Sequence, residues 1–126
     1  MRLARRLRSE RSDETLGLSQ LSALSTLAHQ GPLSPTALAD LERIQPPSMT
    51  RVIAALEERH LVGRAPHPSD RRQSVIEITE AGRAIVLEDH RRRTAWLAKR
   101  IEVLSDEERQ RIADVLPILE RFGNSD

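Results

Sequence analysis

Cysteine is absent from this 126-residue sequence, and aromatic residues make up only 2% of it. The absence of cysteine excludes disulfides, thiolate metal sites and thiol-based redox sensing. Because Trp96 and Phe122 are the only aromatic side chains, the core has to be built from Leu, Ile, Val and Ala. That composition, together with 31% charged residues, favours helices over a β-sandwich or a barrel.

Long apolar runs are also missing. No run of about eighteen apolar residues occurs, so no segment is expected to span a membrane as a helix. The N-terminus lacks the apolar segment of a secretory signal, and we therefore expect a cytoplasmic protein without a membrane partner. The length fits a single domain over residues 1–126 with a modest core.

The residue clusters that catalysis or metal binding would need are not present. No P-loop, G-x-S-x-G or H-E-x-x-H motif occurs. His29, His60, His67 and His90 are scattered, and Glu57 with His60 supplies only two ligands where a zinc site needs about three or four. We therefore expect no enzyme activity, no metal site and no cofactor.

Positive charge is unevenly distributed, although the formal net charge is only +1. Residues 1–11 hold five arginines against Glu10, and Leu3 and Leu7 give them one apolar stripe. This segment is either a frayed basic terminus or a short helix that contacts a dimer partner. From Arg51 to Arg72 there are five arginines and three acids. The arginines lie at the ends of this segment and at its turn, where they could contact DNA phosphates.

The segment from Pro46 to Thr79 has the pattern of a helix followed by a hairpin. Its first half places Met49, Val52, Ile53 and Leu56 at helical spacing, which predicts one buried face. The opposite face is expected to carry small or polar side chains around one arginine, as a helix entering the major groove requires: Ser48, Thr50, Arg51 and Ala54. Two β-prone runs then flank a turn at 65–72, which predicts a hairpin with a basic tip.

Two short helices are predicted before this segment. The first runs from Leu18, with Ser19 as its expected cap, to Gly31-Pro32. The second starts at Ser34-Pro35 and ends before Pro46. Two helices, a turn and a hairpin in this order predict a winged helix-turn-helix.

Two helices with wide apolar faces are predicted after the hairpin. Thr79 is the expected cap of a long helix whose middle, residues 88–93, is charged; this run is either a solvated face or part of a cleft between lobes. Ser105 and Glu108 have the spacing of a capping box and begin a last helix, in which Pro117 either causes a kink or marks a bend over a partner.

The terminal helices carry more apolar surface than one small domain needs to cover, which predicts a symmetric dimer. We assign residues 16–83 to a winged helix-turn-helix lobe, and residues 1–15 and 84–126 to dimerisation helices. A dimer would place two recognition helices about 34 Å apart, so the DNA site should be pseudo-palindromic. The fold class is therefore mainly α with a two-stranded wing.

Residues 16–122 resemble the MarR family of winged-helix repressors. The specific signature is the series Leu56-Glu57, Leu61-Val62, Pro68 to Arg72 as P-S-D-R-R, and Ile78 to Gly82 as I-T-E-A-G. The resemblance implies a homodimer, binding to double-stranded DNA upstream of genes, and often a small lipophilic effector bound between the dimerisation helices and the DNA-binding lobe. The sequence departs from the family at His60, where a glycine is usual.

The resemblance also implies roles for individual residues. Asp70 would hold Arg72 for entry into the minor groove, with Arg71 nearer the phosphates; the alternative is a solvated turn arginine. Pro47, Ser48, Thr50 and Arg51 match the positions that meet the major groove. The alternative for Arg51 is a surface ion pair with an acid such as Glu58.

From these observations we expect a homodimeric transcriptional repressor released by a small lipophilic or anionic effector. The alternative from another class is a winged helix that binds proteins and has no specific DNA site. Topology suggests an apolar effector pocket near four side chains: Leu21, Leu24, Val86 and Trp96.

Overall fold

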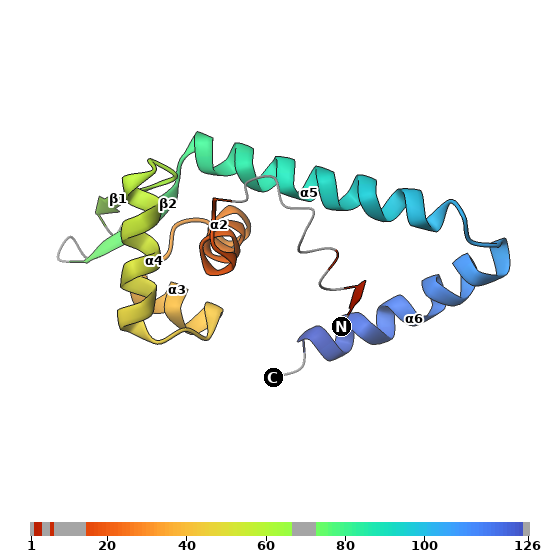
Figure 1. Ribbon diagram of the computed structural model, residues 1–126. Coiled ribbons are helices and arrows are strands. Elements are labelled where there is room, and N and C mark those ends of the chain that lie inside the picture. Colours follow the sequence, from red (N-terminus) through yellow and green to blue (C-terminus); the bar gives the residue numbers. More distant parts are fainter. Residues whose placement is uncertain (1, 4–5, 7–14, 67–72, 125–126) are drawn as a thin grey trace.

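The computed structural model describes residues 2–3, 6, 15–66 and 73–124. The elements follow in the predicted order (Figure 1): α2 (Leu18–Gln30), α3 (Pro35–Glu42), α4 (Pro46–Glu58), β1 (Val62–Pro66), β2 (Ser74–Ile78), α5 (Glu80–Ile101) and α6 (Asp106–Asn124). The wing tip at 67–72, which includes the predicted Asp70, Arg71 and Arg72, lies outside the described residues, as does most of the predicted helix at 1–11.

The start of α2 differs from the prediction. Its N-cap is Gly17, whose backbone N–H donates to the Gln20 side-chain oxygen at 2.8 Å, and the predicted cap Ser19 lies inside the helix. The Gln20 side-chain oxygen accepts the N–H of Gly17, so the helix begins two residues earlier than a cap at Ser19 would place it. It ends as predicted at Gly31, whose φ of 83° few other residues adopt without strain.

The turn between α3 and α4 is held by backbone hydrogen bonds. Ser34 caps α3 by accepting the N–H of Ala37 at 3.1 Å, as predicted. At the other end Arg43 adopts φ 52°, and the N–H of Ile44 donates to the Ala39 carbonyl at 3.0 Å. This left-handed turn, followed by the two prolines that open α4, sets the direction of the recognition helix.

The core of the lobe is aliphatic, as the scarcity of aromatic residues predicts. α4 contributes the buried Met49, Ile53 and Leu56, and these pack with buried residues from α2, α3 and the hairpin. The buried cluster is formed by Leu16, Ala23, Leu24, Leu27, Leu38, Ala39, Met49, Ile53, Leu56, Leu61, Val62, Ile76 and Ile78. Burial of this surface provides the main stabilisation of the lobe.

The hairpin is antiparallel, with Val62 opposite Ile78 and Pro66 opposite Ser74. Strand β2 has a second backbone partner besides β1, which the sequence did not predict. Leu33, in the connection between α2 and α3, exchanges both backbone hydrogen bonds with Ile76, at 3.2 and 2.7 Å. This short bridge covers part of the second edge of β2 and anchors the wing base to the helix-turn-helix.

α5 begins at the hairpin and extends away from the lobe as a long arm, and α6 turns back at its far end (Figure 1). The predicted caps are present: the Thr79 hydroxyl accepts the N–H of Gly82 at 3.1 Å, and Ser105 and Glu108 exchange hydrogen bonds of 2.8 and 3.2 Å. α6 continues through Pro117 to Asn124. No helix of the described segments is both long and apolar enough to cross a membrane.

α6 makes no extensive contact with any other described element. Its apolar side chains are exposed: Ile112, Val115, Leu116, Ile118, Leu119 and Phe122. At the facing end of the arm, Leu97, Ile101 and Val103 are exposed as well. The two helices therefore present an apolar surface that the rest of the described chain does not cover.

Candidate nucleic-acid interface

α4 has the two faces that the sequence predicted. Met49, Ile53 and Leu56 are buried, whereas the opposite side is exposed along its length: Pro47, Ser48, Thr50, Arg51 and Ala54. The predicted alternative for Arg51, an ion pair with Glu58, is not formed. Within the described part of the chain, the side chains of Arg51 and Ser48 have no hydrogen-bond partner, so both side chains are available to an external one.

The N-terminus of α4 determines how this face can meet a nucleic acid. Pro46 and Pro47 occupy the first two helical positions and carry no N–H, and the N–H of Ser48 already donates to the Gln45 carbonyl at 2.9 Å. A helix start of this kind has few backbone donors left for a phosphate. Contacts from α4 must therefore be made by its side chains.

Thr50 presents a restricted set of groups. Its hydroxyl donates to the Pro46 carbonyl one turn earlier at 3.0 Å. With its proton used in this way, the side chain offers an oxygen acceptor and a methyl group to the outside. Those two groups suit an amino group or a thymine methyl in the major groove.

The chain leaves α4 through His60, two residues after the last helical residue Glu58. His60 adopts the left-handed conformation for which a glycine is usual in the family. His60 has φ 56°, its N–H donates to the Glu57 carbonyl at 2.9 Å, and the N–H of Leu61 donates to the Leu56 carbonyl at 2.9 Å. These two bonds, with Leu61 packed near Leu56, form a Schellman motif. The backbone turn is kept although the residue is a histidine.

Thr79 links this turn to the arm. Its hydroxyl donates to the His60 carbonyl at 2.9 Å while accepting the N–H of Gly82, and its own N–H donates to the Leu61 carbonyl at 3.0 Å. One side chain thus connects the end of α4, the end of β2 and the start of α5. The orientation of the arm is fixed at the same point where the recognition helix ends.

The charged run at residues 88–93 of α5 was interpreted from the sequence as either a solvated face or part of a cleft, and each interpretation fits one side of the helix. Glu88 pairs with Arg91 and Arg92 in solvent, and the hydrogen bond from Arg92 lowers the pKa of Glu88. Asp89 is only 5% exposed and pairs with Arg93 at 3.0 Å. The run is a solvated face on one side of the helix and faces the lobe on the other.

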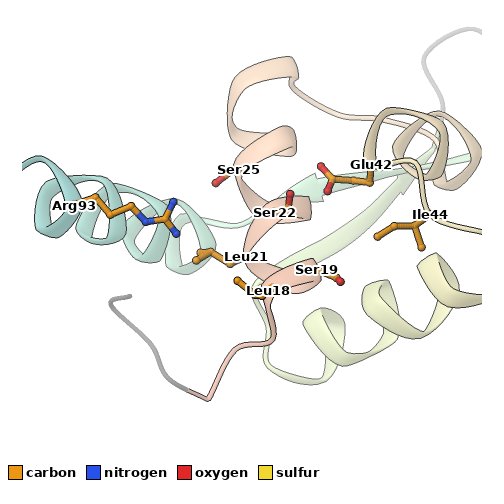
Figure 2. A pocket seen from close by; sticks show the side chains of 8 residues that line it. All are labelled: Leu18, Ser19, Leu21, Ser22, Ser25, Glu42, Ile44 and Arg93. Carbon is orange, nitrogen blue, oxygen red and sulfur yellow. The ribbon is translucent and has the colours of Figure 1, made fainter. Parts of the chain in front are cut away.

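A hollow of about 580 Å³ lies between α2, the turn before α4, and α5 (Figure 2). It is lined by Leu18, Ser19, Leu21, Ser22, Ser25, Glu42, Ile44 and Arg93. Figure 2 shows the Arg93 guanidinium extending from α5 toward Leu21 and the serine side of α2. The Nε of Arg93 is buried and has no hydrogen-bond partner among the described residues.

The four predicted pocket residues are not brought together. Leu21 lines the hollow, Leu24 is fully buried in the core, and Val86 packs against that core. Trp96 lines a separate hollow of about 240 Å³ with Arg92, Lys99 and Arg100. Arg93 belongs to the charged run 88–93, for which a cleft position was one of the two interpretations. The serines were missed, although Ser19, Ser22 and Ser25 repeat every three residues and so share one side of α2.

Among the described residues, no group of three His, Asp or Glu side chains is placed to hold a metal ion. What the site offers is an exposed polar helix face, a wing base beside it and a hollow behind it. The first two are the parts of a protein that docks on duplex DNA.

Comparison with known proteins identifies the fold and its function. The MarR family profile matches residues 16–74. The uncharacterized HTH-type transcriptional regulator Mb0904 of Mycobacterium bovis is 50% identical over 109 residues, which are 86% of this chain and 76% of that protein. The HTH-type transcriptional repressor MdtR of Bacillus subtilis is 26% identical over 108 residues, 86% of this chain and 70% of that one. The crystal structure of RV1404 from Mycobacterium tuberculosis matches with a TM-score of 0.83 and 30% identity, over 90% of this chain and 78% of that one. The chain therefore belongs to the MarR family of DNA-binding, winged helix-turn-helix transcriptional regulators.

Proposed function

We propose that this chain is a homodimeric repressor that reads a pseudo-palindromic operator, with α4 in the major groove and the hairpin wing in the adjacent minor groove. The observation that carries the proposal is the outer face of α4. It is exposed and polar, and the side chains of Arg51 and Ser48 have no partner within the described chain. A side chain without an intramolecular bond can offer all of its hydrogen-bonding groups to a base edge or a phosphate.

The three polar side chains of this face have different roles in the proposal. Arg51 donates two hydrogen bonds to a guanine edge, or binds a backbone phosphate. Thr50 offers its oxygen and methyl group, because its proton is held by Pro46. Ser48 both donates and accepts, and so fixes register more than base identity.

The wing completes the contact. By the family pattern Asp70 orients Arg72 into the minor groove, and Arg71 binds a phosphate. The bridge between Leu33 and Ile76 supports this assignment, since it holds the base of the hairpin beside α4. A narrow minor groove attracts an arginine through its negative potential.

The apolar surface of α5 and α6 supports the homodimer. Leu116 and Leu119 are about half exposed, and Phe122 is three-quarters exposed. A second copy that covers these side chains would remove large apolar groups from water and set two α4 helices about 34 Å apart. We assign α6 and the outer half of α5 to this interface.

The hollow behind α4 supports an effector site for a small anionic molecule. Arg93 supplies a guanidinium, the serines supply hydroxyl groups, and Leu21 and Ile44 supply apolar contacts. Ile44 lies two residues before α4, so a ligand there would act on the entry to the recognition helix. The proposed role as a repressor follows the name of the relative MdtR. Because a bacterial transcriptional regulator binds chromosomal DNA, we place the proposed activity in the cytoplasm.

Selection of duplexes from a random-sequence pool, followed by fluorescence anisotropy with a labelled duplex, tests the proposal. Arg51→Ala should weaken binding to the selected duplex by about 5- to 150-fold. Arg83→Ala is the matched control, because it removes the same charge from an exposed position on the inner half of α5, outside α4 and outside the assigned dimer interface. Arg72→Ala should also weaken binding while the dimer stays folded.

The result that contradicts the proposal is equally clear. If the wild-type chain enriches no duplex, and its weak binding shows no steep dependence on salt, the winged helix serves protein contacts instead. If Arg51→Ala and Arg83→Ala have equal effects, DNA binding stands but α4 does not read the site.

A further inference from the structure

A single guanidinium joins the recognition helix to both strands of the wing. Arg64, in the middle of β1, donates from Nε to Glu57 Oε1 at 2.7 Å and from a terminal nitrogen to Glu57 Oε2 at 3.4 Å. Its other terminal nitrogen lies 3.5 Å from the hydroxyl of Ser74, the first residue of β2. Glu57 belongs to the last turn of α4, so three elements meet at this side chain.

Fold stability does not require this pair. The Arg64 side chain is 45% exposed and that of Glu57 is 31% exposed. Ion pairs in such positions contribute little, because water screens them and two long side chains lose rotamer freedom. The buried contacts of Leu61 and Val62 already attach the start of the hairpin to the lobe.

The place of the pair in the hairpin is what distinguishes it. Along β1 burial falls from Val62, which is buried, to Pro66, which is exposed, so the outer part of the strand leaves the core. Arg64 is opposite Ile76 in the sheet, and its side chain reaches across to Ser74, where β2 begins after the tip at 67–72. The two-point bond to Glu57 therefore constrains the angle of the outer hairpin against α4.

We propose that Glu57 and Arg64 form a positioning pair that sets the wing at the angle needed for the wing and α4 to bind DNA together. This inference rests on the proposed function. Neither residue needs to contact DNA. The pair acts by reducing the range of wing angles, and so the conformational freedom lost on binding.

The direction in which Glu57→Ala changes DNA affinity distinguishes a positioning role from a purely electrostatic one. Glu57→Ala removes an acid near a DNA-binding surface and releases the charge of Arg64, and both changes should strengthen attraction to phosphates. A positioning role predicts the opposite, a loss of affinity of about tenfold, typical of broken networks. Glu58→Ala is the matched control, because Glu58 is the adjacent exposed acid and has no partner within the described chain.

A second substitution keeps the positive charge at position 64 but removes the two-point contact with Glu57. Arg64→Lys retains the positive charge, but an ammonium cannot make the fork-shaped contact to both Glu57 oxygens and reach Ser74. We expect a loss similar to that of Glu57→Ala, and no further loss in the double variant. The urea unfolding midpoint should stay unchanged in all three.

The experiment uses the full chain and a duplex selected by the wild-type protein from a random pool. Anisotropy titrations give the affinities, and hydroxyl-radical footprints give the contacts. We expect Glu57→Ala and Arg64→Lys to lose protection at the outer minor grooves while the central protection from α4 persists.

Three results would overturn the inference: Glu57→Ala binding as tightly as Glu58→Ala, additive losses in the double variant, or protection that weakens evenly across the site. In each of these cases wild-type binding to the selected duplex stands, and with it the proposed function. A wild-type chain that selects no duplex refutes the proposed function itself, and the positioning pair with it.

Discussion

Replacing His60 with glycine should stabilise the protein. The φ of 56° at His60 is imposed by the Schellman bonds to Leu56 and Glu57 and by the hydroxyl of Thr79, so the substitution does not change the backbone. A residue with a Cβ loses about 1–2 kcal/mol in this region. Glycine avoids that cost but has more conformational freedom to lose on folding, about 0.5–1 kcal/mol. The expected net gain is about 0.5–1 kcal/mol.

His60→Ala is the control at the same position. Alanine keeps the Cβ, and hence the strained backbone, while it removes the imidazole, so it should be no more stable than the wild type. Urea unfolding followed by circular dichroism measures both. With an m-value of about 2 kcal/mol per molar, His60→Gly should raise the midpoint by about 0.3–0.5 M. Protein concentration has to be fixed, because a dimer unfolds in a concentration-dependent way.

The reasoning fails if the glycine and alanine variants unfold at the same urea concentration, because the backbone strain would then contribute nothing. It also fails if His60→Gly is less stable than the wild type, which would mean that the imidazole makes a contact worth more than the strain. An altered m-value would point instead to a changed unfolded state.

Two further predictions concern the arm. Gly82→Ala should destabilise the chain by about 1–3 kcal/mol, because an added Cβ would lie 2.3 Å from the Leu61 carbonyl oxygen and 2.8 Å from Ile78. Gly63→Ala, whose Cβ meets nothing within 4 Å, should change the same urea midpoint little; equal losses in both would contradict the packing argument. Leu119→Glu should convert the dimer into a monomer with its lobe folded, as measured by analytical ultracentrifugation, because it buries a charge in the proposed interface. Gln110→Glu adds the same charge where the side chain is exposed and hydrogen-bonded to Asp114, and should leave the dimer intact; a dimeric Leu119→Glu would place the interface elsewhere.

The parts of the fold that depend on short-range chemistry were predictable from the sequence. Ser34, Thr79 and the Ser105–Glu108 box each cap the helix that they were expected to cap. The two-faced character of α4 follows from its apolar spacing alone. Where the prediction of a cap was wrong, at Ser19, the competing group was also local, the amide of Gln20 bonded to Gly17.

Features that join distant residues were not predictable in the same way. Arg64 and Glu57 were separately visible as charges, but nothing in the sequence shows that a strand arginine meets a helix acid seven residues earlier. The Leu33–Ile76 bridge and the hollow at Arg93 depend likewise on how α2, α5 and the hairpin pack. Gly82 is visible in the sequence only as the last residue of the I-T-E-A-G series, and only the packing shows that its missing Cβ lets α5 approach Leu61.

The single tryptophan of the chain is placed so that it can serve as an optical reporter of one part of the molecule. Trp96 lies on the outer half of α5, with its indole N–H buried and the Arg100 guanidinium 4.1 Å from its ring centre. Phe122 is on α6, and the sequence has no tyrosine, so the lobe contains no aromatic ring. Emission from the protein therefore follows the arm alone, and melting of the lobe is silent in that signal. Far-ultraviolet dichroism follows both, so a difference between the two transitions would show the arm and lobe unfolding separately.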